Sequence, residues 1–150
     1  MQLTQKETML LADMQGQEKL CIAKYSKWAA SANDPQLKNL FSELGAVEQK
    51  HLSMLNDIKS GSAPSVPSAS SGTNRTFSAT YSAETPEKQQ DCFLCTDLLA
   101  TEKHASSLYD TCVFEFTDAQ VRNVLAHIQK EEQDHGKAIY DYMKANSMYS

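Results

Sequence analysis

The stretch Glu48-Gln49-Lys50-His51 decides the fold of this chain. Glu48 and His51 are three residues apart, so on a helix they lie on one face. The rest of that face is apolar, because positions at steps of three and four residues carry large apolar side chains. These positions are Leu37, Phe41, Leu44, Leu55 and Ile58. The spacing is typical of a helix in a bundle, and it places a carboxylate and an imidazole where a core is expected.

The same pattern returns on a second apolar face at Glu132-Gln133-Asp134-His135. A shift of 84 residues, the separation of Glu48 from Glu132, aligns the two halves of the chain. The shift also pairs Glu18 with Glu102 and Tyr25 with Tyr109. Because such self-similarity indicates a repeated unit, the sequence predicts two similar helical hairpins.

Apolar periodicity and capping residues predict an all-α fold, a four-helix bundle in a single domain over residues 1–150. The expected helices span 4–32, 34–59, 86–116 and 118–145. Residues 60–86 between the hairpins are rich in Ser and Pro and are expected to form a linker. A connection of this length can cross the whole bundle, so that the second and third helices run in parallel.

Composition excludes several classes of function. The net charge of −5 and the absence of a Lys/Arg cluster argue against a nucleic-acid partner. No stretch approaches the roughly 18 apolar residues of a membrane span, and the N-terminus lacks a signal pattern. We therefore expect synthesis in the cytoplasm, where four cysteines remain thiols. These are Cys21, Cys92, Cys95 and Cys112.

Six polar residues on apolar faces match the arrangement of a dimetal site in a four-helix bundle. They are Glu18, Glu48, His51, Glu102, Glu132 and His135. Four carboxylates carry a charge of about −4, which two divalent cations balance, and mixed carboxylate and imidazole ligands suit iron or manganese. Two Fe or Mn ions are therefore the expected cofactors, with no others. Tyr25 and Tyr109 follow Glu18 and Glu102 by seven residues, so each hydroxyl can reach a ligand carboxylate.

Without metal, shared protons or Glu–His and Tyr–Glu hydrogen bonds must compensate these carboxylates, because unpaired buried charges cost several kcal/mol each. Other candidate sites are weaker. Cys92 and Cys95 form a CxxC motif without the second pair of a zinc site, so ordinary thiols are expected. His104 and His127 fall off the apolar faces and are expected in solvent, as are the neighbours of Glu132 within 130–134.

Several stretches resemble the spore coat protein F family of spore-forming Firmicutes, within the ferritin-like superfamily that includes bacterioferritin and rubrerythrin. They are Lys6–Asp13, Gln17–Cys21, Thr101–Asp110 and, at the ending, Tyr142-Met143 and Met148-Tyr149. The resemblance implies a ferritin-like bundle located in the spore coat, with other coat proteins as partners. An iron-oxidising role is implied only by the more distant relatives, at the six ligand positions and the two tyrosines.

The resemblance favours a structural or assembly role in the endospore coat. A diiron or dimanganese oxidoreductase that consumes oxygen or peroxide is the alternative, and its expected activities are those of a ferroxidase, a peroxidase or a catalase. A third interpretation is a homodimeric helical adaptor whose site has lost its activity. An enzyme needs a path from solvent to its metal, so a large side chain such as Phe41 or Trp28 plugging the site would argue against it.

Overall fold

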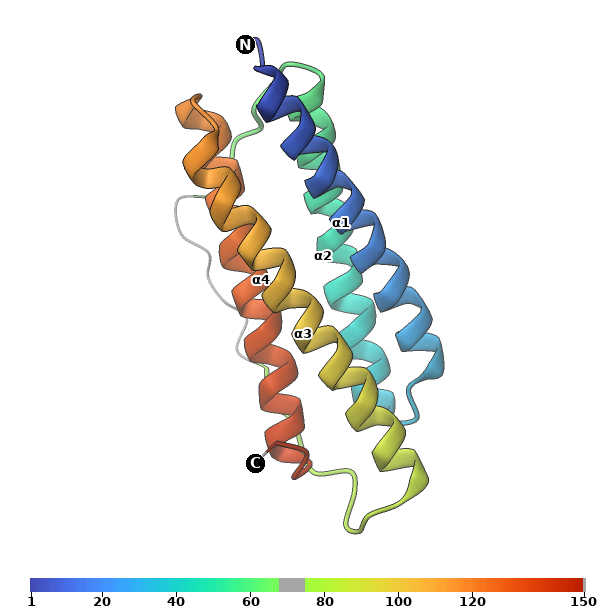
Figure 1. The fold of residues 1–150 in the computed structure, drawn as a ribbon. Coiled ribbons are helices and arrows are strands. Elements are labelled where there is room, and N and C mark those ends of the chain that lie inside the picture. Colours follow the sequence, from blue (N-terminus) through green and yellow to red (C-terminus); the bar gives the residue numbers. More distant parts are fainter. Residues whose placement is uncertain (68–74, 150) are drawn as a thin grey trace.

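A computed structural model describes residues 1–67 and 75–149 of the chain. They form four α-helices and, within these ranges, no strand (Figure 1). The helices are α1 (Gln5–Ser31), α2 (Pro35–Lys59), α3 (Pro86–Glu115) and α4 (Ala119–Ala145). The predicted all-α fold with four helices is therefore confirmed. The expected linker over 60–86 lies in part outside the described residues.

Each helix begins at a residue whose side chain accepts hydrogen bonds from the first turn. Asp34 caps α2 and Asp118 caps α4 through the backbone N–H of Gln36 and Gln120. Thr4 and Glu7 form a reciprocal capping box at the start of α1. Pro follows the cap of α2 and of α3, where its fixed φ suits the first helical position.

The helices pack as two hairpins, α1 with α2 and α3 with α4 (Figure 1). Contacts between their ends fix the relative direction. The backbone N–H of Thr117, just before α4, donates to Glu7 on α1 at 2.9 Å. The backbone N–H of Asn33, just before α2, donates to Asp91 on α3 at 2.8 Å. Because α2 and α3 begin at the same end of the bundle, they run in parallel.

The apolar core consists of two clusters at different heights along the helices. The Tyr142 cluster includes Tyr25, Phe41, Leu98 and Ile139. The Phe116 cluster includes Met14, Leu55, Cys112 and Leu125. On every helix, buried Glu or His residues separate the members of one cluster from those of the other. The bundle therefore has a polar layer in the middle of its core. No helix in the described part of the chain has the length and apolar character needed to cross a membrane.

Candidate metal centre

The polar layer contains all six predicted ligands, one Glu each from α1 and α3 and a Glu-x-x-His pair each from α2 and α4. All are at most 3% exposed. Their donor atoms form two sets of four, each set lying within 4.8 Å. The sets are Glu18, Glu48, His51 and Glu132, and Glu48, Glu102, Glu132 and His135. Glu48 and Glu132 belong to both sets, so they are the two carboxylates that a pair of ions in this layer would share.

Both imidazoles turn the Nδ1 atom toward these carboxylates. His51 Nδ1 lies 3.0 Å from Glu48 Oε2 and 3.1 Å from Glu132 Oε1. His135 Nδ1 lies 3.1 Å from Glu48 Oε1. The rings stack at 6.0 Å with an interplanar angle of 18°. One nitrogen from each ring is thus directed at the space that the two sets share.

The two tyrosines lie where the spacing places them, and each holds a carboxylate of the opposite hairpin. Tyr25 donates to Glu102 Oε1 at 2.5 Å, and Tyr109 donates to Glu18 Oε1 at 2.6 Å. Burial and the neighbouring carboxylates raise the pKa of both tyrosines well above the usual range. Both hydroxyls therefore stay protonated and fix one oxygen of each glutamate, leaving the other oxygen available.

Those other oxygens accept no hydrogen bond in the described part of the chain, although Glu18 Oε2 lies 3.8 Å from His51 Nδ1. Within the described residues, no hydrogen bond reaches the buried Oε2 atom of Glu18, Glu102 or Glu132. Burial and the nearby Glu48 raise the pKa of Glu18 to about 8. Hydrogen bonds with the surrounding carboxylates, Glu102 first, outweigh burial and raise the pKa of His135 to about 9. Without metal, protons therefore balance the layer, but the three orphaned oxygens are the partners that a cation needs. Oxygen-rich sites with imidazole suit Mn(II) or Fe(II), so the residues present fit such ions.

The sequence-based expectation of solvent-exposed side chains at Glu131 and His127 is wrong. Glu131 Oε1 lies 3.0 Å from His51 Nε2 and also 3.0 Å from His127 Nε2. The His127 side chain is 9% exposed. Glu131 thus holds the outer nitrogen of a predicted ligand, an arrangement that fixes ring orientation in metal sites. The spacing of His127 and Glu131, four residues apart on one helix, is the signal that points to this pair.

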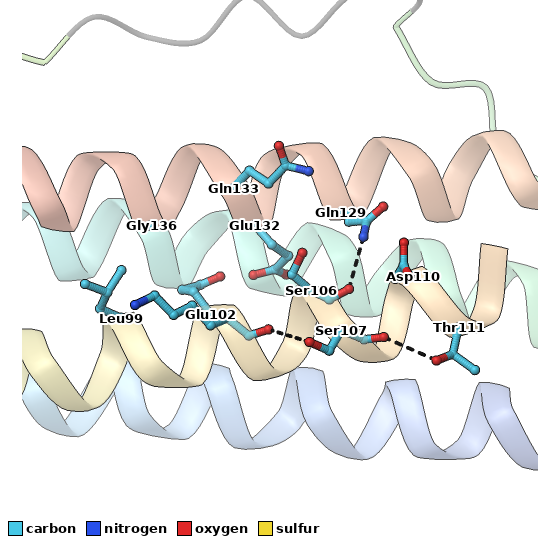
Figure 2. A pocket seen from close by; sticks show the side chains of 11 residues that line it. Leu99, Glu102, Ser106, Ser107, Asp110, Thr111, Gln129, Glu132, Gln133 and Gly136 are labelled. Atoms are coloured by element: carbon cyan, nitrogen blue, oxygen red, sulfur yellow. Dashed lines mark hydrogen bonds between the residues drawn. The ribbon is translucent and has the colours of Figure 1, made fainter. Parts of the chain in front are cut away.

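A groove between α3 and α4 leads from the surface to the polar layer (Figure 2). Its volume is about 750 Å³, and its lining includes Glu102 and Glu132. Phe41 and Trp28 do not line it. Phe41 packs on Tyr25 with ring centroids 6.0 Å apart, and Trp28 Nε1 donates to Asp97 at 2.9 Å. Neither side chain plugs the layer from this direction.

The cysteines lie outside the six-residue cluster. All four are free in the structure, and Cys95 is buried while Cys92 is half-buried. Burial raises the pKa of Cys95, so this residue is a thiol at neutral pH. The pair has the character of ordinary packing residues rather than of metal ligands.

Comparison with known proteins gives one match. Residues 90–150, which contain most of α3 and all of α4, match a family model described as the Coat F domain. No curated protein and no solved structure gives a significant match.

Proposed function

Because residues 90–150 match the family model of the Coat F domain, we propose that this chain is a structural or assembly component of the bacterial endospore coat. The family match is the observation that supports this location, and it makes other coat proteins the expected partners. The bundle leaves several large apolar side chains on its surface as contact points for such partners. They include Met9, Phe93 and Phe114, with 63%, 64% and 79% exposure.

The same proposal includes the architecture, a single ferritin-like domain with a dimetal site in its polar layer. The parallel course of α2 and α3 supports it, as does the distribution of the six polar residues over four helices. In this site Glu18, Glu48, His51, Glu102, Glu132 and His135 hold two Fe or Mn ions, and Tyr25 and Tyr109 orient two of the carboxylates.

The observation that carries the metal proposal is the set of three buried carboxylate oxygens without a hydrogen-bond partner. A buried polar atom left unpaired costs about 1–3 kcal/mol, and more if it is charged. The three glutamates that carry these oxygens form ion pairs with His51 and His135, and the two sets add further carboxylates nearby. Two divalent cations would satisfy all three oxygens at once, so metal binding is the simplest way to stabilise this layer.

A second candidate function is a dimetal oxidoreductase acting on oxygen or peroxide. The groove that reaches Glu102 and Glu132 favours it, since a purely structural layer has no need of a route from solvent. Bound iron or manganese would supply the redox chemistry. The chain would supply the buried carboxylates and imidazoles that hold the ions, and the tyrosine hydroxyls that keep two of those carboxylates in place.

The deciding measurement is metal content by mass spectrometry after anaerobic loading with Fe(II) or Mn(II). We expect about two ions per chain, and loss of both in the Glu48→Ala/Glu132→Ala variant. Glu43→Ala is the matched control, because the Glu43 side chain on α2 is 62% exposed and pairs only with Arg75 among the described residues. No metal above the level of the double variant would overturn the site.

Two further measurements test the location in the spore coat and the alternative function as an oxidoreductase. We expect the chain in the coat fraction of purified spores, and its absence there would contradict a coat role. Oxygen and peroxide consumption by the loaded protein then tests the oxidoreductase. Consumption that is lost in Glu48→Ala/Glu132→Ala would favour the enzyme, and no consumption by the loaded protein would leave the structural role.

A further inference from the structure

We propose that the groove between α3 and α4 is the route by which divalent cations reach the polar layer, and that the equivalent face between α1 and α2 is closed to them. This inference rests on the proposed metal centre and adds its direction of loading. Figure 2 shows the groove with Glu102 on one helix and Glu132 on the other.

The floor of the groove consists of groups that attract a cation. Glu102 and Glu132 are 2% and 1% exposed, and each has a buried Oε2 atom without a hydrogen bond among the described residues. Carboxylate oxygens are the ligands that hard divalent cations take. An ion that enters here therefore first meets Glu102 and Glu132, two ligands of the set that contains His135. Glu132 also belongs to the set that contains His51, so it connects the two.

The walls of the groove are polar and contain small residues. They are formed by Lys103, Ser106, Ser107, Asp110, Thr111, Gln129, Gln133 and Gly136, besides Leu99. At Gly136 the space is not filled, because a Cβ atom there would meet only Leu99 Cδ1 within 4 Å, at 3.6 Å. Polar side chains in the walls can form hydrogen bonds with the water molecules that hydrate an entering cation.

The repeat provides an internal comparison for this route. The counterpart of Ser106 in the first hairpin is Ile22, and the counterpart of Gly136 is Leu52. Both replacements are large and apolar. The depression between α1 and α2 is lined by residues such as Ile22 and Ala46 and by none of the six carboxylates and histidines.

The first test replaces two residues of the α3–α4 groove by their larger repeat counterparts from the first hairpin. In Ser106→Ile/Gly136→Leu, the groove receives the side chains of Ile22 and Leu52. Mn(II) uptake, followed by the loss of the free-ion paramagnetic resonance signal, is expected to slow at least tenfold. The final content stays at about two ions per chain, because no ligand has changed. Ser42→Ile/Ala46→Leu places similar bulk in the α1–α2 depression and is expected to leave the rate unchanged.

The second test uses surface charge and leaves the interior intact. Lys103 lines the groove, and its repeat counterpart Lys19 is an exposed residue of α1 that does not line the α1–α2 depression. Removing a positive charge at the mouth of a cation route raises the local cation concentration. Lys103→Glu is therefore expected to speed Mn(II) uptake several-fold at low ionic strength, with the difference shrinking as salt is added. Lys19→Glu is expected to match the wild type.

The outcomes separate the route from the site. If the wild-type chain takes up no metal, both the proposed centre and its route are wrong. If it binds two ions but the groove variants load at the wild-type rate, only the route is overturned. If Ser106→Ile/Gly136→Leu does not fold, as judged by circular dichroism, the comparison of Lys103→Glu with Lys19→Glu decides. Equal rates in those two variants would contradict the proposal.

Discussion

The two hairpins are alike in how they hold several of their buried carboxylates. Tyr109 donates to Glu18 of the first hairpin, and Tyr25 donates to its counterpart Glu102 in the second. The likeness extends to the ends of the bundle. Glu7 accepts the N–H of Thr117, and Asp91, its counterpart 84 residues later, accepts the N–H of Asn33. Each hairpin thus satisfies the polar groups of the other, which neither could do alone.

The hairpins differ around the polar layer rather than inside it. Glu131 holds the outer nitrogen of His51, whereas the repeat counterpart of Glu131 in the first hairpin is Val47. Gly136 lines the groove, whereas its counterpart is Leu52. The six central residues are therefore matched between the hairpins, while the residues around them differ in hydrogen bonding and in contact with the groove.

The largest expected effect concerns the two carboxylates at the ends of the bundle. Asp91 is fully buried and accepts hydrogen bonds from the N–H groups of Asn33 and Asp34 and from the Tyr81 hydroxyl. Asp91→Ala leaves the N–H of buried Asp34 without a partner, so we expect the free energy of unfolding to fall by about 3–5 kcal/mol in urea titrations. Glu7→Ala should lower the free energy of unfolding by only about 2 kcal/mol. Its partners Thr4 and Thr117 are exposed, so their freed groups can form hydrogen bonds with water.

The comparison would fail if Glu7→Ala destabilised the chain as much as Asp91→Ala. Asp91→Asn serves as the control for Asp91, because it keeps one acceptor oxygen and nearly the same volume. We expect it to lose less stability than the alanine variant. An equal loss in the two variants would show that charge, rather than hydrogen-bond acceptance, accounts for the stabilisation.

A smaller difference is expected between the two Asp caps. Asp34 caps α2 and also accepts the Tyr142 hydroxyl at 2.7 Å, whereas Asp118 caps α4 and is only half-buried. Asp34→Ala should lower the free energy of unfolding by about 2 kcal/mol and Asp118→Ala by about 1 kcal/mol. In a Tyr142→Phe background the cost of Asp34→Ala should fall toward that of Asp118→Ala. An unchanged cost there would contradict a role for the tyrosine.

The pH dependence of the Asp34 effect provides a further check on its cause. Burial raises the pKa of Asp34, but hydrogen bonds from Thr80, Tyr142 and Gln36 outweigh burial and lower it below its usual value. The stabilisation is therefore complete above the unfolded-state pKa of about 4 and is lost as the pH falls below it. The difference between wild type and Asp34→Ala should stay constant near neutrality and shrink in acid.

Most of the fold follows from local signals in the sequence. The three- and four-residue spacing around Glu48 and Glu132 predicts the helices, and the repeat predicts their grouping into hairpins. The meeting of the six polar residues follows in turn, because they lie near the middle of their helices, where counterpart positions on antiparallel helices reach the same height. The two tyrosines were predicted on the same basis, since seven residues span two helical turns.

The remaining features depend on how the helices are rotated and how closely they pack, which periodicity does not specify. Glu131 is adjacent to a core position, and only the packing of α4 against α2 brings it to His51. The groove is lined by Gly136, which has no side chain to fill it. The repeat does pair Asp91 with Glu7, so this shared acidic position was a signal that sequence reasoning missed.

The most local effect is expected from removing the support that only one histidine receives from Glu131. Glu131→Val copies Val47 of the first hairpin and deletes the acceptor of His51 Nε2. The ring of His51 then loses its fixed orientation, because Glu131 contacts the nitrogen that points away from the carboxylates. Loss of such outer contacts typically costs 10–100-fold in metal affinity. Competition with a chelator should therefore show one Mn(II) ion bound about tenfold more weakly, and the other unchanged.

His127→Ala is the control for this prediction, because His127 contacts the same oxygen of Glu131, whereas the partner of His51 Nε2 is Glu131 itself. It leaves the acceptor in place, so its effect on affinity should be smaller than that of Glu131→Val. Equal weakening of both ions in Glu131→Val would mean that the carboxylate acts through the charge of the whole layer. Weakening of one ion alone would mean that the difference between the two hairpins makes the two halves of the centre unequal.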